Sequence, residues 1–404
     1  GDSSYYIGGL VGYNYGTIQN SYATGDVSGN YDVGGLVGYN DYEIYNSYAT
    51  GTVTGTGGNS YDIGGLVGYN YGYIYNSYYS TGTVNGDSNV GGLVGYNEYG
   101  TITECGWWRG AANDAIGYDS NVGDVVNRLF EQGYGYDEDS VSAFYDSTHA
   151  LYATWDFNGL WVSSATYPHL IWQDMTGGGT ASNPWQITTV NELQFMKYAL
   201  SDYFILSNDI PAASTSTWNS GAGFAPVGDS NDYFSGTFDG NNKTITGLYI
   251  NRPDSYYVGL FGYIGSSGEV SNVGLVDADV SGYQYVGALA GENDGTISNS
   301  YSTGTVNGVV SSNNTSSQYI GGLVGYNYSG ESIKNSYSTA TVSAPYSEND
   351  GYYTYYIGGL VGYNYGIIQN SYATGDVSGY SQVGGLVGYN YYSTIQNSYA
   401  TGSV

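Results

Sequence analysis

The sequence predicts an all-β fold: a parallel β-helix, or β-solenoid, built from coils of about 26 residues, where a coil is one turn of the solenoid. Three observations lead to this prediction. The segment G-G-L-V-G-Y-N recurs along the chain, glycine and asparagine interrupt each copy, and tyrosine returns at fixed positions. Self-similarity at about 20 to 50 residues is typical of solenoids and propellers. A β-propeller is the rival fold, but its blades usually need about 40 residues or more.

One copy, Ile7–Gly29, shows why short strands are expected. Its apolar residues are too few and too evenly spread for an amphipathic helix. Its six glycines would each cost roughly 1 kcal/mol inside a helix, whereas Gly and Asn suit tight turns and Val, Ile, Thr and Tyr suit strands. A recurrent leucine marks the copies, at Leu10, Leu36, Leu66, Leu93, Leu260, Leu289, Leu323, Leu360 and Leu386.

Stacking of the copies places like side chains above one another. One copy is too small to bury its own apolar face, and pairing with the coils on either side, at about 4.8 Å per layer, solves this. We predict a tyrosine ladder at Tyr22, Tyr48, Tyr78, Tyr301, Tyr337, Tyr372 and Tyr399. We predict an asparagine ladder at Asn20, Asn46, Asn76, Asn299, Asn335, Asn370 and Asn397. The tyrosines are read as stabilising ladders, with carbohydrate stacking or lateral fibre contacts as alternatives.

The copies differ in length at one place. Extra residues follow the T-G-T-V or T-A-T-V segment, at Thr54–Tyr61, Val309–Tyr319 and Ala344–Tyr356. One corner of the solenoid is therefore expected to carry loops of variable length while the coil stays fixed.

The copies resemble GLUG-motif repeats, which occur in bacterial and archaeal surface proteins. The resemblance rests on G-G-L-V-G-Y-N followed by I-x-N-S-Y-A-T-G-x-V, which about six copies match nearly completely, and it covers residues 1–104 and 256–404. Such repeats are found in filamentous-haemagglutinin-like adhesins and in the non-catalytic part of IgA-protease-type surface peptidases. The resemblance implies secretion, a β-solenoid and a role at the cell surface, and it does not imply an enzyme.

Four regions are expected along the chain. Residues 1–104 are the C-terminal part of a GLUG solenoid, and residues 105–176 are a Trp-rich plug that closes it. Residues 177–202 are a linker and helical cap, and residues 203–404 are a second solenoid with GLUG coils. The plug is expected because an open solenoid end exposes unpaired strand edges.

Two helices are predicted between the stacks. Apolar residues at helical spacing predict a helix over Asn121–Gln132, inside the plug, with Gly133 as its stop. A second helix is predicted over Asn191–Leu200, with Leu193, Met196 and Leu200 on one face and Thr189 or Asn191 as its cap. The segment W-D-F-N-G-L-W from Trp155 resembles the aromatic segment that often closes GLUG modules.

A longer repeat is also indicated. Residues 355–379 match residues 5–29 at all but one position, an offset of 350 residues that the following coil keeps. This favours a 350-residue module of cap, coils and plug. Chance agreement between similar copies is the alternative. The chain begins at Gly1 without Met or a signal peptide, so we expect a processed chain or a piece of a longer one.

Composition limits the partners. With 35 acidic and 6 basic residues, a formal charge of −29 argues against nucleic acid and anionic membranes. The charge is read as a solubility device, with weak cation capture as the alternative. No apolar stretch approaches the length of a membrane span. The single cysteine, Cys105, is expected to be a buried small hydrophobe rather than an intermolecular link.

The sequence shows no motif of a known catalytic class. It lacks H-E-x-x-H, G-x-S-x-G and P-loop patterns, and its two histidines, His149 and His169, are read as structural. No cofactor is expected. Calcium is conceivable at Asp137, Glu138 and Asp139, or at Asp229 with Asp232. Possible N-glycosylation sites are Asn242, Asn313, Asn314 and Asn327.

These observations predict a secreted, non-enzymatic structural protein at the cell surface. The expected role is a segment of a fibre or stalk, in which identical chains join end to end. The alternative is an adhesin that binds surface glycans through its tyrosine faces. A β-helix carbohydrate enzyme is a third reading, and it would need three or more carboxylates close together in a groove.

Overall fold

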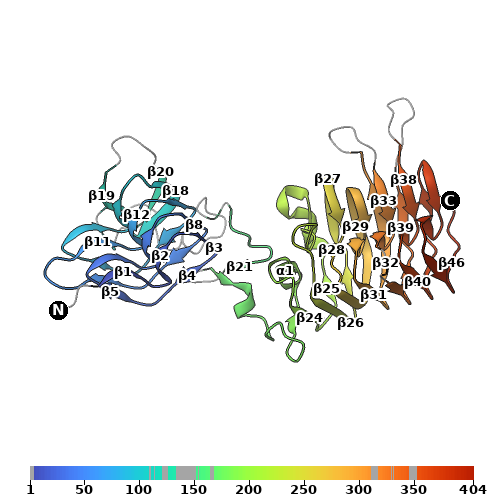
Figure 1. Cartoon of the computed structure of the whole chain (residues 1–404), viewed down its shortest axis with the longest axis horizontal. Coiled ribbons are helices and arrows are strands. Elements are labelled where there is room, and N and C mark those ends of the chain that lie inside the picture. Colours follow the sequence, from blue (N-terminus) through green and yellow to red (C-terminus); the bar gives the residue numbers. More distant parts are fainter. Residues whose placement is uncertain are drawn as a thin grey trace. The chain divides into compact units, whose positions relative to one another are not determined.

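The computed structural model describes residues 4–108, 111–112, 114–120, 126–132, 152, 154–163, 168–310, 317–328, 330, 332–344 and 353–404. The described chain forms two compact units (Figure 1). Unit 1 comprises residues 1–157 and 161–169, and unit 2 comprises residues 158–160 and 170–404. Each unit is described by itself.

Unit 1 is a parallel β-solenoid. In residues 4–132, the described strands pair in parallel with equivalent strands of neighbouring coils, and the long strand over Thr101–Trp108 pairs with two strands of the preceding coil. A separate two-stranded sheet joins β21 (Trp161–Val162) and β22 (His169–Leu170). The equivalent strands are β1 (Tyr5–Gly8), β6 (Tyr31–Gly34), β11 (Tyr61–Gly64) and β16 (Ser88–Gly91); β2 (Val11–Asn14), β7 (Val37–Asn40), β12 (Val67–Asn70), β17 (Val94–Asn97) and β19 (Ile116–Asp119); β3 (Thr17–Gln19), β8 (Glu43–Tyr45), β13 (Tyr73–Tyr75), β18 (Thr101–Trp108) and β20 (Val126–Gln132); β4 (Tyr22–Ala23), β9 (Tyr48–Ala49) and β14 (Tyr78–Tyr79); β5 (Val27–Gly29), β10 (Val53–Gly55) and β15 (Val84–Asn85).

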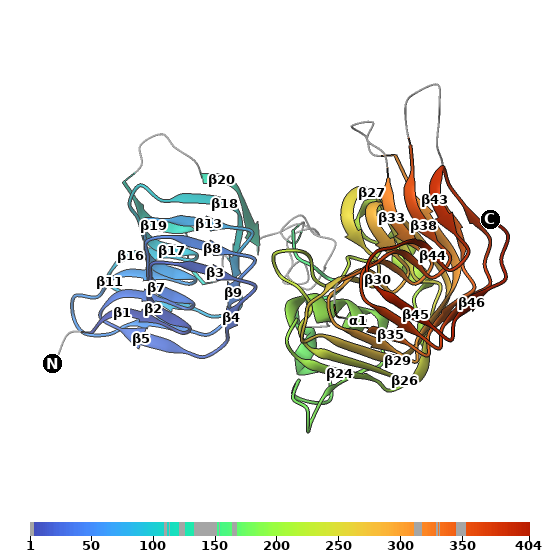
Figure 2. The ribbon, with the colours of Figure 1, turned by 45° about the vertical axis from the view of Figure 1, so that its right-hand side comes forward.

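Unit 2 repeats this architecture, and Figure 2 shows its coils side by side along the stack. Its first coils are irregular, with long strands that turn corners, and its later coils have the short strands of unit 1. The strands are β23 (Trp185–Ile187), β24 (Tyr203–Leu206), β25 (Ile210–Pro211), β26 (Thr237–Thr246), β27 (Tyr249–Val258), β28 (Phe261–Ile264), β29 (Glu269–Gly287), β30 (Ala290–Asn293), β31 (Thr296–Ser298), β32 (Tyr301–Gly308), β33 (Gln318–Gly321), β34 (Val324–Asn327), β35 (Ser332–Lys334), β36 (Tyr337–Ser338), β37 (Thr341–Ser343), β38 (Tyr355–Gly358), β39 (Val361–Asn364), β40 (Ile367–Gln369), β41 (Tyr372–Ala373), β42 (Val377–Ser378), β43 (Ser381–Gly384), β44 (Val387–Asn390), β45 (Thr394–Gln396) and β46 (Tyr399–Ala400).

The register confirms the predicted parallel solenoid. Ile7 pairs with Val33, and Tyr39 pairs with Tyr69, so like residues face like residues in successive coils. The apolar residue of each position therefore enters the core of its own unit. Fully buried members of this core include Leu36, Val37, Ile44, Ile63, Leu66, Val67, Ile74 and Leu93 in unit 1, and Leu289, Ile297, Leu323, Ile333, Leu360 and Ile368 in unit 2.

Glycine is required where the chain of one coil is pressed against another. A Cβ atom on Gly38 would lie 2.4 Å from the carbonyl carbon of Tyr6, which belongs to the preceding coil. The same atom on Gly362 would lie 2.5 Å from the main-chain nitrogen of Ile320. Both distances are shorter than any tolerated contact, so the glycine of the V-G-Y-N strand is fixed by packing.

The cap helix forms where it is predicted but is shorter. Helix α1 spans Val190–Phe195 and passes into a 3₁₀ turn at Met196–Tyr198. Thr189 is its N-cap, and its hydroxyl accepts the Glu192 main-chain N–H while the Glu192 carboxylate accepts in return. Leu193 and Met196 are fully buried, as their spacing predicts.

The predicted helix over Asn121–Gln132 is wrong for residues 126–132. These residues form β20, which pairs in parallel with β18 through Ile102–Val126 and Cys105–Leu129. Residues 121–125 lie outside the described part. The open edge of β18 offers backbone partners that outweigh a helical apolar spacing, because pairing depends on context more than propensity does. The first solenoid therefore runs beyond residue 104.

Candidate functional site

The outer tyrosines of each coil form a file in both units. In unit 1, the ring centroids of Tyr22 and Tyr48 are 5.0 Å apart, as are those of Tyr48 and Tyr78. In unit 2 the centroids are 4.8 Å apart from Tyr301 to Tyr337, 4.7 Å from Tyr337 to Tyr372 and 5.1 Å from Tyr372 to Tyr399. All of these rings are within 6° of parallel. We call these files the outer Tyr columns.

The outer asparagines stand beside the tyrosines, two residues earlier in each coil. Each adopts a left-handed backbone, with φ between 48° and 52°, which Asn tolerates better than most residues. In unit 2, Asn335 donates to Asn299, Asn370 donates to Asn335, and Asn397 donates to Asn370, each at 3.1 Å. In unit 1, Asn46 donates to Asn20 at 3.4 Å. We call these files the outer Asn columns.

In unit 1 a tryptophan segment covers both columns. We call residues 154–157 and 161–163 the Trp segment. The Trp155 ring lies 6.3 Å from Tyr48 and 5.8 Å from Tyr78, and the Trp161 ring lies 6.1 Å from Tyr48. The covered tyrosines Tyr48 and Tyr78 are 2% and 0% exposed. The aromatic contacts thus bury Tyr48 and Tyr78 almost completely, while Tyr22 is half-buried.

Hydrogen bonds fix the Trp segment in place. The Trp155 indole donates to the main-chain carbonyl of Asn76 at 3.1 Å. The Thr154 hydroxyl donates to the side chain of Asn46 at 2.7 Å. The Tyr48 hydroxyl donates to the carbonyl of Pro168 at 2.9 Å. The Trp segment therefore forms hydrogen bonds with the outer Asn column as well as ring contacts with the outer Tyr column.

In unit 2 the equivalent columns are open. Tyr301, Tyr337 and Tyr372 are half-buried and Tyr399 is 55% exposed. Within the described part of the chain, Tyr337 has ring contacts only with Tyr301 and Tyr372. The neighbouring asparagines, Asn299, Asn335, Asn370 and Asn397, are exposed.

A second asparagine column lies inside each solenoid, and the sequence reasoning missed it. The asparagine that ends each V-G-Y-N strand, or the A-G-E-N strand at Asn293, is buried except at the exposed Asn390, and within each unit the side-chain amide of one member donates to that of the next at 2.8 Å. The members are Asn14, Asn40, Asn70 and Asn97 in unit 1, and Asn293, Asn327, Asn364 and Asn390 in unit 2. We call these files the inner Asn columns. The return of an asparagine at this position in every coil is the sequence signal that would have revealed them.

The inner column corrects one predicted glycosylation site. Asn327 is 0% exposed, donates to Asn364 and accepts from Asn293. A glycan on its amide nitrogen is incompatible with this packing. Asn242 is exposed, with a φ of 57°. Asn313 and Asn314 lie outside the described residues.

Only one of the two candidate calcium sites, Asp229 with Asp232, lies in the described part of the chain. The Asp229 carboxylate accepts the main-chain N–H groups of Asn231 and Asp232, which closes a local turn. Asp137, Glu138 and Asp139 lie outside the described residues. Within the described ranges, no group of three or more His, Cys, Asp or Glu side chains could hold a metal ion.

Cys105 is fully buried, as predicted. Its thiol lies 3.2 Å from the carbonyl of Thr103, and burial raises the pKa of the thiol to about 12. The thiolate is therefore absent at neutral pH. His169 is half-buried, and His149 lies outside the described residues.

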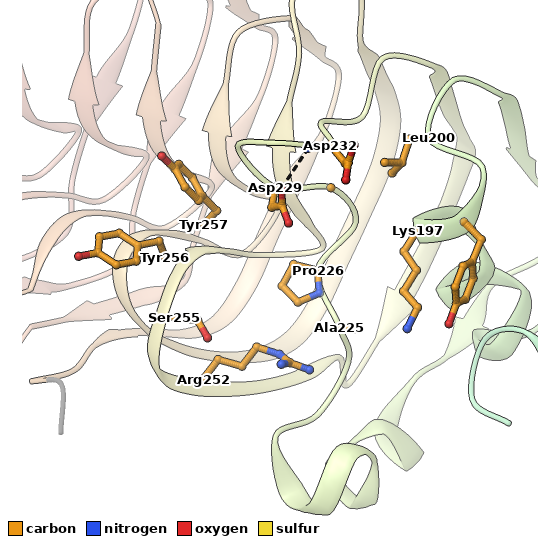
Figure 3. A pocket seen from close by; sticks show the side chains of 12 residues that line it. Lys197, Leu200, Ala225, Pro226, Asp229, Asp232, Arg252, Ser255, Tyr256 and Tyr257 are labelled. Atoms are coloured by element: carbon orange, nitrogen blue, oxygen red, sulfur yellow. Dashed lines mark hydrogen bonds between the residues drawn. The ribbon is translucent and has the colours of Figure 1, made fainter. Parts of the chain in front are cut away.

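A pocket of about 450 Å³ opens on the side of unit 2 near its cap (Figure 3). Lys197 and Arg252, two of the six basic residues of the chain, line it. Tyr256, which is 53% exposed, and Asp229 also line it. Arg252 is held by its own Nε–H, which donates to the carbonyl of Phe224 at 3.2 Å.

Comparison with known proteins identifies the repeat. The GLUG motif matches residues 3–28, 29–54, 282–307, 316–343, 353–378 and 379–404. The chain therefore carries six GLUG motifs, as the sequence predicts.

Two relatives share parts of the chain. Over 158 residues, 37% of this chain, it is 39% identical to halomucin of Haloquadratum walsbyi. Over 128 residues, 30% of this chain, it is 40% identical to a candidate Gly-rich membrane protein of Evansella cellulosilytica. The matches span 2% and 15% of the length of these relatives.

One solved structure also matches. It is a candidate immunoglobulin A1 protease from Bacteroides ovatus, with a TM-score of 0.43 and 28% identity, and the match covers 55% of this chain and 68% of that one. In the described part of this chain, no helix has the length and apolar content needed to cross a bilayer.

Proposed function

Because this chain carries six GLUG motifs on stacked parallel coils, we propose that it is a non-enzymatic structural segment of an extracellular surface protein. Its solenoids act as stiff rods that join end to end with identical chains. Similarity to halomucin and to a Gly-rich membrane protein supports the surface location.

One observation carries the structural role: coils pair in register with the same residues at the same positions. Tyr372 pairs with Tyr399, Val361 with Val387, and Ile368 with Ile395. Backbone hydrogen bonds and ring stacks thus run parallel to the axis along which the coils stack. A load along that axis is shared by every strand of a coil, as a stalk requires.

The same register supports end-to-end joining. The coil from Ser381 presents Tyr389, Ile395 and Tyr399, each more than a third exposed. The coil from Tyr5 presents Leu10 and Tyr13, which are 47% and 49% exposed. A further coil with the same residues would continue either stack in register. Identical sequences in residues 5–29 and 355–379, apart from one position, make such coils interchangeable.

Electron microscopy of the purified chain tests this proposal. We expect filaments whose axial repeat equals the length of one chain. Filaments should disappear when a charged residue is placed on the exposed coil face, as in Ile395→Lys. The matched control is Ile367→Lys, at a 40% exposed position of the preceding coil. Monomers alone at high protein concentration would contradict the assembly.

A second function, glycan binding, is favoured by the pocket of unit 2. An exposed Tyr256 offers a ring face to a sugar, Asp229 accepts hydroxyl protons, and Arg252 with Lys197 suits a carboxylate. A glycan array with uronic-acid and neutral oligosaccharides tests it. We expect retention of acidic glycans that Tyr256→Ala and Arg252→Gln abolish. Tyr328→Ala, at a 45% exposed tyrosine elsewhere in unit 2, is the matched control.

A further inference from the structure

The tyrosine of the V-G-Y-N strand forms a column of its own in unit 1. Successive ring centroids are 4.8, 4.7, 4.9 and 5.1 Å apart along Tyr13, Tyr39, Tyr69, Tyr96 and Tyr118. Each pair is stacked, with at most 21° between the ring planes. We call this file and its counterpart in unit 2 the strand Tyr columns. Each of these coils thus adds one ring to the file.

A glutamate interrupts the strand Tyr column of unit 2. Strand β30 reads A-G-E-N, and its Glu292 pairs with Tyr263 of β28 on one side and with Tyr326 of β34 on the other. Within the described coils, Glu292 is the one member of these columns that is not a tyrosine. The stack resumes beyond it, because the rings of Tyr326 and Tyr363 are 4.9 Å apart. The rings on either side of Glu292 are therefore separated by two layers, or about 9.6 Å.

Two further tyrosines form the side of the interrupted layer. The rings of Tyr257 and Tyr285 stack on one another at 4.8 Å. The Tyr257 ring meets that of Tyr263 at 5.6 Å, and the Tyr285 ring meets that of Tyr326 at 5.9 Å, both at 62°. All four rings are half-buried. Tyr257 also lines the pocket of Figure 3, so this cluster of rings adjoins an opening to solvent.

The Glu292 carboxyl group is buried among these rings without a partner. Its residue is 7% exposed, and within the described part of the chain it takes part in no hydrogen bond or ion pair. Asp294 lies nearby: its Oδ2 accepts the Tyr263 hydroxyl at 2.7 Å, while its Oδ1 is buried without a donor from the described residues. Burial and the charge of Asp294 raise the pKa of Glu292 to about 8. Buried carboxylates are normally paired with a cation, so the site presents the negative half of an ion pair.

The surroundings of Glu292 favour an organic cation over a metal ion. Burial and the Glu292 charge together raise the pKa of Tyr257, which places the carboxyl group beside that ring. A cation midway between Tyr263 and Tyr326 would lie about 4.8 Å from each ring centroid, within the limit of about 6 Å for a cation–π contact. Calcium takes about six to eight oxygen ligands, whereas this site combines two carboxyl groups with four aromatic rings. Ring faces and a carboxylate together suit an alkylammonium group.

We propose that the interrupted layer is a binding site for an alkylammonium group, built from Glu292, Tyr257, Tyr263, Tyr285 and Tyr326. The carboxylate pairs with the positive charge, and the rings contact the methyl or methylene groups around it. Such a head group ends the lysine side chain of a protein and also occurs in free methylated amines. The inference goes beyond the proposed function, since neither end-to-end joining nor binding in the glycan pocket requires Glu292.

Isothermal titration calorimetry of the full chain tests the proposal. The probes are choline, for a free methylated amine, and the peptide acetyl-Gly-Lys-Gly-amide, for a lysine side chain. We expect saturable binding of one molecule per chain by at least one probe, and the tighter probe identifies the source of the head group. The uncharged carbon analogue of choline, dimethylbutanol, should bind at least tenfold more weakly. Equal binding of choline and this analogue would overturn the inference.

Substitutions of Glu292 separate the site from the fold. Glu292→Tyr restores the residue found in the other coils, so the chain should fold, and its ring fills the layer and should abolish binding. Glu292→Gln removes the charge and should weaken binding at least tenfold. Glu269→Gln, at an exposed glutamate of unit 2, is the matched control and should change nothing. Circular dichroism and thermal melting check each variant. Binding that survives in Glu292→Tyr would overturn the inference.

The pH dependence of binding gives an independent measurement. Burial raises the pKa of the four surrounding tyrosines and of Asp294, so the carboxyl groups of Glu292 and Asp294 are the ones that titrate between pH 6 and 9. A cation pairs with the ionised carboxylate, so choline should bind at least tenfold more tightly at pH 9 than at pH 6. Glu292→Gln should reduce this difference. Equal affinity at the two pH values, or displacement of choline by calcium chloride at constant ionic strength, would contradict an alkylammonium site.

Discussion

The corner that precedes G-G-L differs between the two units. In both units its residue has a left-handed backbone, with φ between 48° and 62°. Unit 1 places Tyr6, Asp32, Asp62 and Asn89 there, and unit 2 places Tyr257, Tyr285, Tyr319, Tyr356 and Gln382 there. We call these files the corner columns. The same backbone thus carries carboxyl groups in one unit and aromatic rings in the other.

The consequences for stability are opposite. In unit 2 the rings of Tyr285 and Tyr319 are 4.7 Å apart and those of Tyr319 and Tyr356 are 5.2 Å apart, so neighbours attract. In unit 1, burial and the neighbouring charge of Asp62 raise the pKa of Asp32 to about 7. Each corner residue lies beside its counterpart in the next coil, so the choice of side chain decides whether two neighbouring layers attract, as at Tyr285 and Tyr319, or repel, as at Asp32 and Asp62.

The largest loss of stability is expected from substitutions in the inner Asn columns. Both units contain such a column, so the same substitution can be compared between them. Asn70→Ala and Asn327→Ala each leave two buried amide partners unsatisfied, at a cost of about 3 kcal/mol in free energy of unfolding. Native-state hydrogen exchange should show the loss in the unit that carries the variant. Unequal losses would mean that the two solenoids are not equivalent.

Tyr319→Asn should break the aromatic corner column of unit 2. Asparagine tolerates the left-handed backbone, so the loss reports the two ring stacks and amounts to about 2 kcal/mol. Slower exchange of the same amides in the variant would contradict a stabilising role. Gln382→Asn, at an exposed corner position of unit 2 with a φ of 48°, changes the corner column without removing a ring or adding a charge and is the matched control.

Asp32→Asn should sharpen the contrast by its dependence on pH. The folded pKa of Asp32 is raised, so its stabilising contribution is full below about pH 4 and is lost as pH rises through about 7. The variant should therefore stabilise unit 1 by roughly 1–3 kcal/mol at pH 8 and change little at pH 4. Its new amide can donate to Asp62, as Asn89 does at 2.7 Å.

Cys105 supplies the measurement for that prediction. It is the only cysteine, it is buried in unit 1, and it reacts only when this unit opens. We expect labelling of Cys105 at pH 8 to be at least fivefold slower in Asp32→Asn. The prediction fails if both proteins are labelled at the same rate at pH 8, or if their labelling rates differ more at pH 4 than at pH 8. Either result would show that the Asp32–Asp62 pair does not lower the stability of unit 1.

The smallest effect is expected at the outer Asn columns. Asn335→Ala should cost about 1 kcal/mol because alanine does not favour a φ of 49°. Asn335→Gly relieves that strain and should recover part of the loss, leaving the cost of two 3.1 Å amide bonds. Thermal melting of unit 2 distinguishes the two substitutions.

The solenoid was predictable because periodic spacing of Leu10, Leu36 and Leu66 is a global signal that does not depend on local propensity. The strand β20 was not, because Val122–Phe130 has helical spacing and its partner edge lies in β18. The inner Asn column was also missed, since burial of Asn70 depends on its neighbours Asn40 and Asn97.

The outer columns show a different limit. Alignment of the repeats alone predicted which tyrosines and asparagines would stack on one another in successive coils. It did not predict that Trp155 would cover Tyr48 and Tyr78. The sequence contains the tryptophans, but the choice between unit 1 and unit 2 depends on chain path rather than on the repeat.

Gly38 and Gly362 have a consequence for how such a protein can change over time. No side chain fits between their strand and the preceding coil, so substitutions there are excluded in every layer at once. Duplication of a whole coil meets no such obstacle, because the added coil has a glycine at the same position and packs against its neighbour as the original coil does. Proteins of this build are therefore expected to grow or shrink by entire turns, and to diversify at the loops between them.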